Sequence, residues 1–91
     1  MTHRRIFDGT EAAGGYARAV KAGNMVFVAG TTSLTREGAV AGADMYAQSV
    51  ITFDKIEAAL REAGADLSHV VRLTCYVTSL DDAGGFTRAL R

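Results

Sequence analysis

Apolar and polar positions alternate along the first third of the chain in a pattern that predicts a β-hairpin. Residues 25–30 (MVFVAG) are continuously apolar, which is typical of a strand covered on both faces. Residues 16–21 alternate between an alanine face and a face of larger side chains. The segment 22–24 (AGN) tolerates the positive φ that a tight connection requires. Two antiparallel strands are therefore expected, with residues 2–8 as a short edge strand.

The centre of the chain has the periodicity of an amphipathic helix over residues 45–63. Asp44 is a predicted N-cap, and Gly64 is placed for a left-handed C-cap. Glu57 and Arg61 stand four residues apart in the favourable order for an ion pair on the helix surface. The apolar face of this helix consists of Phe53, Ile56, Leu60 and Ala63.

Residues 69–78 (HVVRLTCYVT) have the strict alternation of a strand. One set of side chains, which includes Cys75, is expected to face the long helix, so that thiol is predicted to be buried and inert. The other set contains Arg72, which is expected to face either a channel between subunits or a solvated sheet face. This segment is predicted to be a strand of the sheet.

A second helix is predicted after Ser79, which has the spacing of a capping box with Asp82. Gly84 and Gly85 in its first turns weaken the helix propensity by about 1 kcal/mol each relative to alanine. Between the hairpin and the long helix, residues 31–42 are polar and rich in glycine, and such loops often carry ligand contacts. The element order predicts an α+β fold with helices packed on one face of a largely antiparallel sheet.

Composition limits the function. The 91 residues (9.6 kDa) are expected to form a single domain over 1–91, and the formal net charge of +0 gives no electrostatic footprint for nucleic acid. Cys75 is the only cysteine, and no CxxC or paired-histidine spacing suggests a metal. No apolar run approaches the roughly 20 residues of a membrane span. A cytoplasmic protein without a metal or membrane partner is expected.

Several short stretches together resemble the Rid family of reactive intermediate deaminases, whose members are also labelled liver perchloric-acid-soluble proteins or endoribonucleases. The resemblance covers nearly the whole chain from Gly14 to Leu90. The matching residues are GYARAV (15–20), GN (23–24), VAGTT (28–32), Gly38, Asp44, Gln48, Ala59, Leu60, AGA (63–65), Leu67, VVR (70–72) and YVT (76–78).

The resemblance implies a chorismate-mutase-like fold and a homotrimer with ligand sites in the clefts between subunits. Family members hydrolyse reactive 2-imino or enamine acids to 2-oxo acids and ammonia, with neither a metal nor an organic cofactor. In those members an arginine that binds the substrate carboxylate and a glutamate that positions water lie on two closing strands after the second helix. The chain ends before such strands, so it is expected to be truncated relative to the family, and no catalytic residue is assigned.

Four residues are candidates for binding a small carboxylate-bearing substrate in the cleft. By resemblance, Tyr16 matches a pocket tyrosine, and Thr87 stands where the family has an asparagine, while Ala29 replaces a pocket serine. Gly30 and Thr31 are candidates because small loops present N–H groups and hydroxyls to carboxylates. Packing at a strand start remains the alternative for Tyr16, and an ordinary turn remains the alternative for Gly30 and Thr31.

Three functional hypotheses follow. The first is a Rid-like homotrimer that deaminates 2-imino or enamine acids, and the second is a non-catalytic module of the same fold that binds a small metabolite. A ribonuclease is the least favoured hypothesis, because the neutral charge gives little attraction to phosphate.

Overall fold

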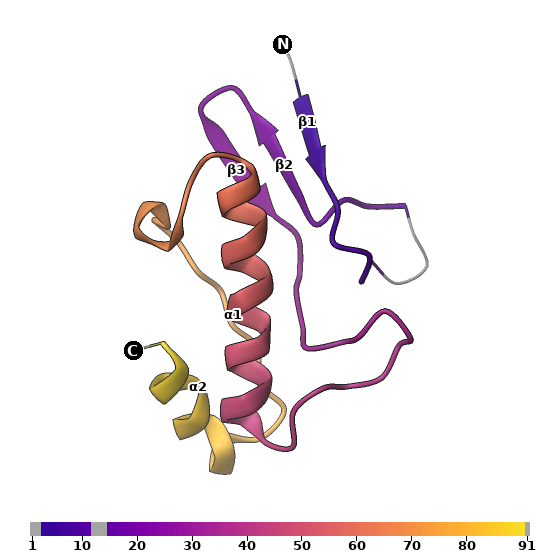
Figure 1. Cartoon of the computed structure of the whole chain (residues 1–91). Coiled ribbons are helices and arrows are strands. Elements are labelled where there is room, and N and C mark those ends of the chain that lie inside the picture. The colour runs from indigo at the N-terminus through magenta and orange to yellow at the C-terminus, as the bar shows by residue number, and fades with distance from the viewer. Residues whose placement is uncertain (1–2, 12–14, 91) are drawn as a thin grey trace.

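The computed structural model describes residues 3–11 and 15–90. Its sheet consists of β1 (His3–Ile6), β2 (Ala19–Ala22) and β3 (Met25–Val28), antiparallel in the order β1-β2-β3 (Figure 1). Gly23, with φ of +61°, lies in the two-residue connection between β2 and β3. The predicted hairpin is confirmed with shorter strands, and the predicted edge strand 2–8 corresponds to β1, although residue 2 lies outside the described residues.

The long helix α1 (Met45–Glu62) begins at the predicted residue and ends one residue before the predicted end, with Ala63 as its C-cap. The Asp44 carboxylate accepts a hydrogen bond of 2.8 Å from the Ala47 backbone nitrogen. At the other end, Ala65 N donates to Leu60 O, and Gly64, with φ of +88°, occupies the left-handed position. The predicted surface pair is also present, with Arg61 Nη2 and Glu57 Oε2 3.2 Å apart.

The core lies between the sheet and α1, which covers one face of the sheet (Figure 1). Small side chains on α1 let the helix approach the sheet closely. The core consists of Ile6 and Ala19 from the sheet, Ala59 from α1 and Ala63 at the C-cap of α1, with Val26 and Val28 packed against it.

The opposite face of the sheet is open, and it carries large apolar side chains. Phe27 is 57% exposed and pairs across the strands with Val20, while Phe7 and Met25 are exposed as well. Within one chain α1 supplies one covering layer for β3, as predicted, and the cover of its other face stays a prediction that depends on neighbouring subunits.

The prediction of a strand over residues 69–78 is wrong for this structure. His69 closes a 3-10 turn (Leu67–His69) that Asp66 caps, and the residues after it form no ladder within the described part of the chain. Val71 and Tyr76 are 97% and 92% exposed. Cys75 is exposed too, so the prediction of a buried thiol is also wrong. Alternation alone does not make a strand, because a strand needs a partner edge for its hydrogen bonds.

The second helix is present as α2 (Ala83–Ala89), preceded by a 3-10 turn (Leu80–Asp82). Figure 1 shows α2 beside the first half of α1. Phe86 of α2 packs against Phe53 of α1 as a tilted ring pair with centroids 5.8 Å apart. The predicted Ser79 cap is wrong, because the Ser79 side chain makes no capping hydrogen bond. The fold is α+β, with a small antiparallel sheet and helices layered on one side. Among the described residues, no helix is long and apolar enough to cross a membrane.

Candidate functional site

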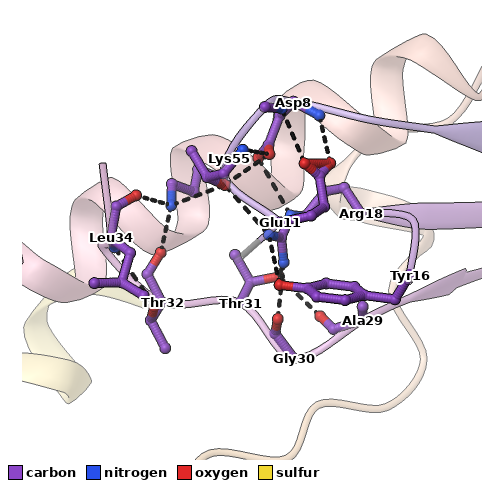
Figure 2. Close-up of polar contacts among 12 residues, drawn as sticks. Asp8, Glu11, Tyr16, Arg18, Ala29, Gly30, Thr31, Thr32, Leu34 and Lys55 are labelled. Atoms are coloured by element: carbon purple, nitrogen blue, oxygen red, sulfur yellow. Dashed lines mark hydrogen bonds and ion pairs between the residues drawn. The ribbon is translucent and has the colours of Figure 1, made fainter. Parts of the chain in front are cut away.

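A buried arginine organises the end of the sheet that lies near the loop after β3. Arg18 is only 2% exposed, and its guanidinium donates hydrogen bonds to four oxygens (Figure 2). Nη1 donates to Gly30 O at 2.8 Å and to Thr31 Oγ1 at 3.1 Å. Nη2 donates to Thr10 Oγ1 at 3.2 Å and to Tyr16 Oη at 3.5 Å. The Arg18 side chain therefore joins Tyr16, which precedes β2, to the loop that contains Thr10 and to the loop after β3.

Asp8 supplies the negative charge opposite Arg18. Arg18 Nε and Asp8 Oδ2 lie 3.2 Å apart as an ion pair without hydrogen-bond alignment, while Asp8 Oδ1 accepts from Thr10 N and Thr10 Oγ1 at 2.8 and 2.6 Å. Partial burial acts to raise the pKa of Asp8, but the Thr10 hydrogen bonds and the positive charges of Arg18 and Lys55 outweigh it and lower that pKa below its usual value. Asp8 is therefore held as a carboxylate.

Lys55 joins this group of charges to α1. Its ammonium donates to the backbone oxygens of Thr32 and Leu34 at 2.8 and 2.5 Å and to Thr10 Oγ1 at 3.3 Å. Burial lowers the pKa of Lys55 and the nearby Arg18 charge acts in the same direction, against the attraction of Asp8. The loop after β3 is thus attached to the helix layer by a charged side chain.

We call Asp8, Thr10, Arg18 and Lys55 the Arg18 cluster. It includes three charged residues that the sequence analysis did not select as site residues. Arg18 could have been suspected, because an arginine lies within a strand pattern flanked by two alanines. Asp8 and Lys55 carry no such local signal, since their contacts link residues up to 45 positions apart.

Three of the four predicted site residues lie around the Arg18 cluster. Tyr16 is 41% exposed, and the Arg18 guanidinium carbon lies 5.5 Å from the centroid of its ring. Gly30 and Thr31 contact Arg18 directly. The fourth residue, Thr87, is exposed on α2, which packs on α1 and not on the sheet. The chain therefore does not bring Thr87 together with the other three.

The Thr31 hydroxyl has an internal role in this structure. It donates to Ala29 O at 2.8 Å and accepts from Arg18. The Gly30 carbonyl accepts from Arg18 as well. These contacts stabilise the loop and occupy the Thr31 hydroxyl and the Gly30 carbonyl. Of the three residues, Tyr16 therefore has the side chain most suited to contact a ligand, because it is 41% exposed and carries a hydroxyl.

A groove of about 760 Å³ lies on the open face of the sheet, and Tyr16 is part of its wall. Its other walls are mainly apolar, with Arg5 and Glu11 as the charged members. The Glu11 carboxylate accepts from the backbone nitrogens of Asp8 and Gly9 at 2.8 and 3.0 Å. Apolar walls with few polar groups are typical of small-molecule sites. The groove is lined by Phe7, Val20, Phe27, Val28 and Ala29, among others.

A metal centre has no ligand set in the part of the chain that the structure describes. Residues 3–11 and 15–90 contain no group of three or more His, Cys, Asp or Glu side chains placed to hold a metal ion.

Comparison with known proteins places this arrangement in a family. A family model described as Endoribonuclease L-PSP matches residues 8–91. A RutC family protein of Pyrococcus abyssi is 40% identical over 70 residues, which cover 76% of this chain and 55% of that protein. An uncharacterized protein of Streptomyces coelicolor is 37% identical over 86 residues, covering 90% of this chain and 64% of that protein. The chain thus spans a little over half the length of the first of these relatives.

Solved structures have the same fold. A Mycobacterium tuberculosis member of the YjgF/YER057c/UK114 family superposes with a TM-score of 0.84 at 36% identity, over 98% of this chain and 71% of that one. RidA from an Antarctic Psychrobacter superposes with a TM-score of 0.81 at 28% identity, over 94% of this chain and 72% of that one. The family resemblance seen in the sequence is confirmed. The chain belongs to the Endoribonuclease L-PSP family, whose members include the YjgF and Rid proteins.

Proposed function

We propose that this protein is a Rid-type deaminase that hydrolyses reactive 2-imino or enamine acids to 2-oxo acids and ammonia. One observation carries the proposal beyond family membership: the exposed Tyr16 forms part of the wall of a groove on the uncovered apolar face of the sheet. We place the reaction in this groove, which neighbouring copies of a homotrimer would complete. The whole chain, 1–91, acts as one domain in this proposal.

The open sheet face supports the association of copies. Phe7, Met25 and Phe27 expose more than half of their surfaces there, in a chain of only 91 residues. Contiguous exposed apolar surface commonly marks a protein interface, and small domains gain stability by covering it. In this arrangement Thr87 would join the site from a neighbouring copy, because α1 separates α2 from the groove within one chain.

The reaction requires little from the protein besides binding and orientation. An enamine acid first tautomerises to the imine, and water then adds to the C2 carbon. A proton moves to the nitrogen, and the C–N bond breaks to release ammonia and leave the C2 carbonyl of the 2-oxo acid. Tyr16 is assigned to hold the substrate through its hydroxyl, because a site that fixes orientation accelerates such an addition. The residue that activates water is not assigned.

The test is the release of pyruvate from 2-aminoacrylate generated in situ from serine by a dehydratase. Wild-type protein is expected to raise the rate above spontaneous hydrolysis in proportion to its concentration, and Tyr16→Phe is expected to lower kcat/KM. Arg61→Met, which changes an exposed surface pair on α1, is the control. Absence of acceleration by the wild-type protein would sink the enzymatic proposal.

Binding without catalysis is the second candidate, and the Arg18 cluster favours it. The two Nη atoms of Arg18 already donate within the chain and its Nε is paired with Asp8, so Arg18 supports the wall of the groove and adds no free donor for catalysis. An Escherichia coli protein of the same fold, 23% identical, has been solved with bound serine, which makes serine a reasonable probe.

A thermal-shift titration separates this second candidate from the first. Binding predicts that the midpoint of unfolding rises with serine concentration, and that Tyr16→Phe weakens the rise. A shift that Tyr16→Phe leaves unchanged would place serine elsewhere.

We further propose a cytoplasmic location, which the free thiol of Cys75 supports because disulfides are rare in that compartment.

A further inference from the structure

We infer that Arg18 is a positioning residue of the proposed site: it fixes the wall formed by Tyr16 and the Gly30–Thr31 loop and turns the Tyr16 hydroxyl into a hydrogen-bond donor toward the groove. The inference rests on the proposed role of Tyr16 in holding the substrate. It adds a residue that acts through Tyr16 and does not itself contact the substrate.

The direction of the Arg18 hydrogen bonds supports this role. A guanidinium has five N–H donors and no acceptor, so the Tyr16 oxygen can only accept from Arg18 Nη2. The hydrogen of the Tyr16 hydroxyl is then left to point away from Arg18. The hydrogen bond from Arg18 Nη2 to Tyr16 Oη is long, at 3.5 Å. The guanidinium carbon also lies 5.5 Å from the centroid of the Tyr16 ring, so the positive charge interacts with the ring as well as with the hydroxyl.

Arg18 can position other groups because its own position is fixed. Its side chain is buried, it is paired with Asp8, and it contacts Thr10, which Lys55 also contacts from α1. Lys55 in turn holds the loop after β3 through Thr32 O and Leu34 O. Figure 2 shows Asp8 and Tyr16 beside Arg18, and Lys55 near Thr32 and Leu34. The wall of the groove is therefore supported by charged contacts to both the sheet and the helix layer.

The fork shape of arginine matters here as much as its charge. Nη1 donates to Gly30 and Thr31, and Nη2 donates to Thr10 and Tyr16. The planar guanidinium therefore fixes the distance between the Gly30–Thr31 loop and Tyr16. A lysine would keep a positive charge near Asp8, but its single ammonium does not match this planar pattern. Arg18→Lys is thus the conservative variant that separates charge from geometry.

The test measures whether Arg18 acts through Tyr16. Wild type, Arg18→Lys, Arg18→Met and Tyr16→Phe are compared, with the two Arg18 changes also made in the Tyr16→Phe background and Arg61→Met as the control. Arg18→Lys is expected to lower kcat/KM for 2-aminoacrylate by about tenfold, because small misplacements of a binding group are costly. In the Tyr16→Phe background, the same change should have little further effect. Fully additive losses would overturn the inference.

A second readout keeps the inference separate from the proposed activity. The ring signals of Tyr16 in NMR spectra, assigned by their loss in Tyr16→Phe, are expected to shift in Arg18→Lys and to stay in place in Arg61→Met. If the wild-type protein shows no deamination, the proposed function fails, and these signals still decide whether Arg18 positions Tyr16. Unchanged Tyr16 signals in a folded Arg18→Lys protein would contradict the inference even in an active enzyme. Arg18→Lys decides the question if Arg18→Met fails to fold.

Discussion

Gly85 of α2 packs so closely on Tyr46 of α1 that a β-carbon placed on Gly85 would lie 2.6 Å from the Tyr46 backbone nitrogen. The same β-carbon would lie 3.1 Å from the Met45 side chain. Gly84, the preceding residue, has no heavy atom within 4 Å of such a position. The two adjacent glycines, which the sequence suggested would only weaken α2, therefore have different roles.

The first prediction compares alanine at these two positions. Gly85→Ala is expected to lower the free energy of unfolding by about 1–3 kcal/mol, because the helices must separate to admit the methyl group. Gly84→Ala is expected to leave it unchanged or raise it by up to about 1 kcal/mol through helix propensity. Urea unfolding of the two variants checks this, and equal stabilities would show that α2 does not pack on α1 in this way.

The second prediction concerns acid. The pKa of Asp8 is lowered in the folded state, so its stabilising contribution is complete above the unfolded value of about 3.9 and is lost as the pH falls through the folded value. The free energy of unfolding should therefore fall on acidification below about pH 4. Asp66 acts in the same window, since hydrogen bonds from Ser68 lower its pKa.

Variants assign the contribution of Asp8 to this pH dependence. Asp8→Asn is expected to make the fall in stability below pH 4 less steep, because one of the groups that must be protonated has been removed. Asp54→Asn, on the exposed surface of α1, serves as the control. Chemical unfolding at a series of pH values gives the comparison. If Asp8→Asn keeps the wild-type slope, the Asp8–Arg18 pair does not contribute to acid sensitivity.

The third prediction tests the exposed segment after α1. Cys75 is exposed, so its thiol should react with an aromatic disulfide reagent in the native protein at a rate close to that of the unfolded chain. The measurement follows the absorbance of the released thiolate with and without urea. Protection of Cys75 until the protein unfolds would mean that a partner or another part of the chain covers residues 70–78.

The hairpin and α1 were predictable because their signals are local. The turn at Gly23, the cap at Asp44 and the left-handed Gly64 each act within a few residues of the chain. Residues 70–78 have equally clear alternation, but pairing depends on an edge elsewhere in the fold, which the pattern does not record.

The candidate site was only partly predictable for the same reason. Tyr16, Gly30 and Thr31 were selected by resemblance and by loop composition, and the structure brings them together. The residue that joins them, Arg18, was not selected, because its importance comes from burial among acceptors that lie 8 to 13 positions away. Thr87 remains a proposal that depends on a second copy.

Sedimentation equilibrium of the wild-type protein and of Phe27→Asp tests most directly whether the open sheet face is where copies meet to complete the site. We expect a wild-type mass of three times the chain mass of 9.6 kDa, and a folded Phe27→Asp protein that stays at 9.6 kDa, because a charge on that face prevents its burial. A wild-type protein that remains at 9.6 kDa over the full concentration range, or a trimer that Phe27→Asp leaves intact, would contradict it.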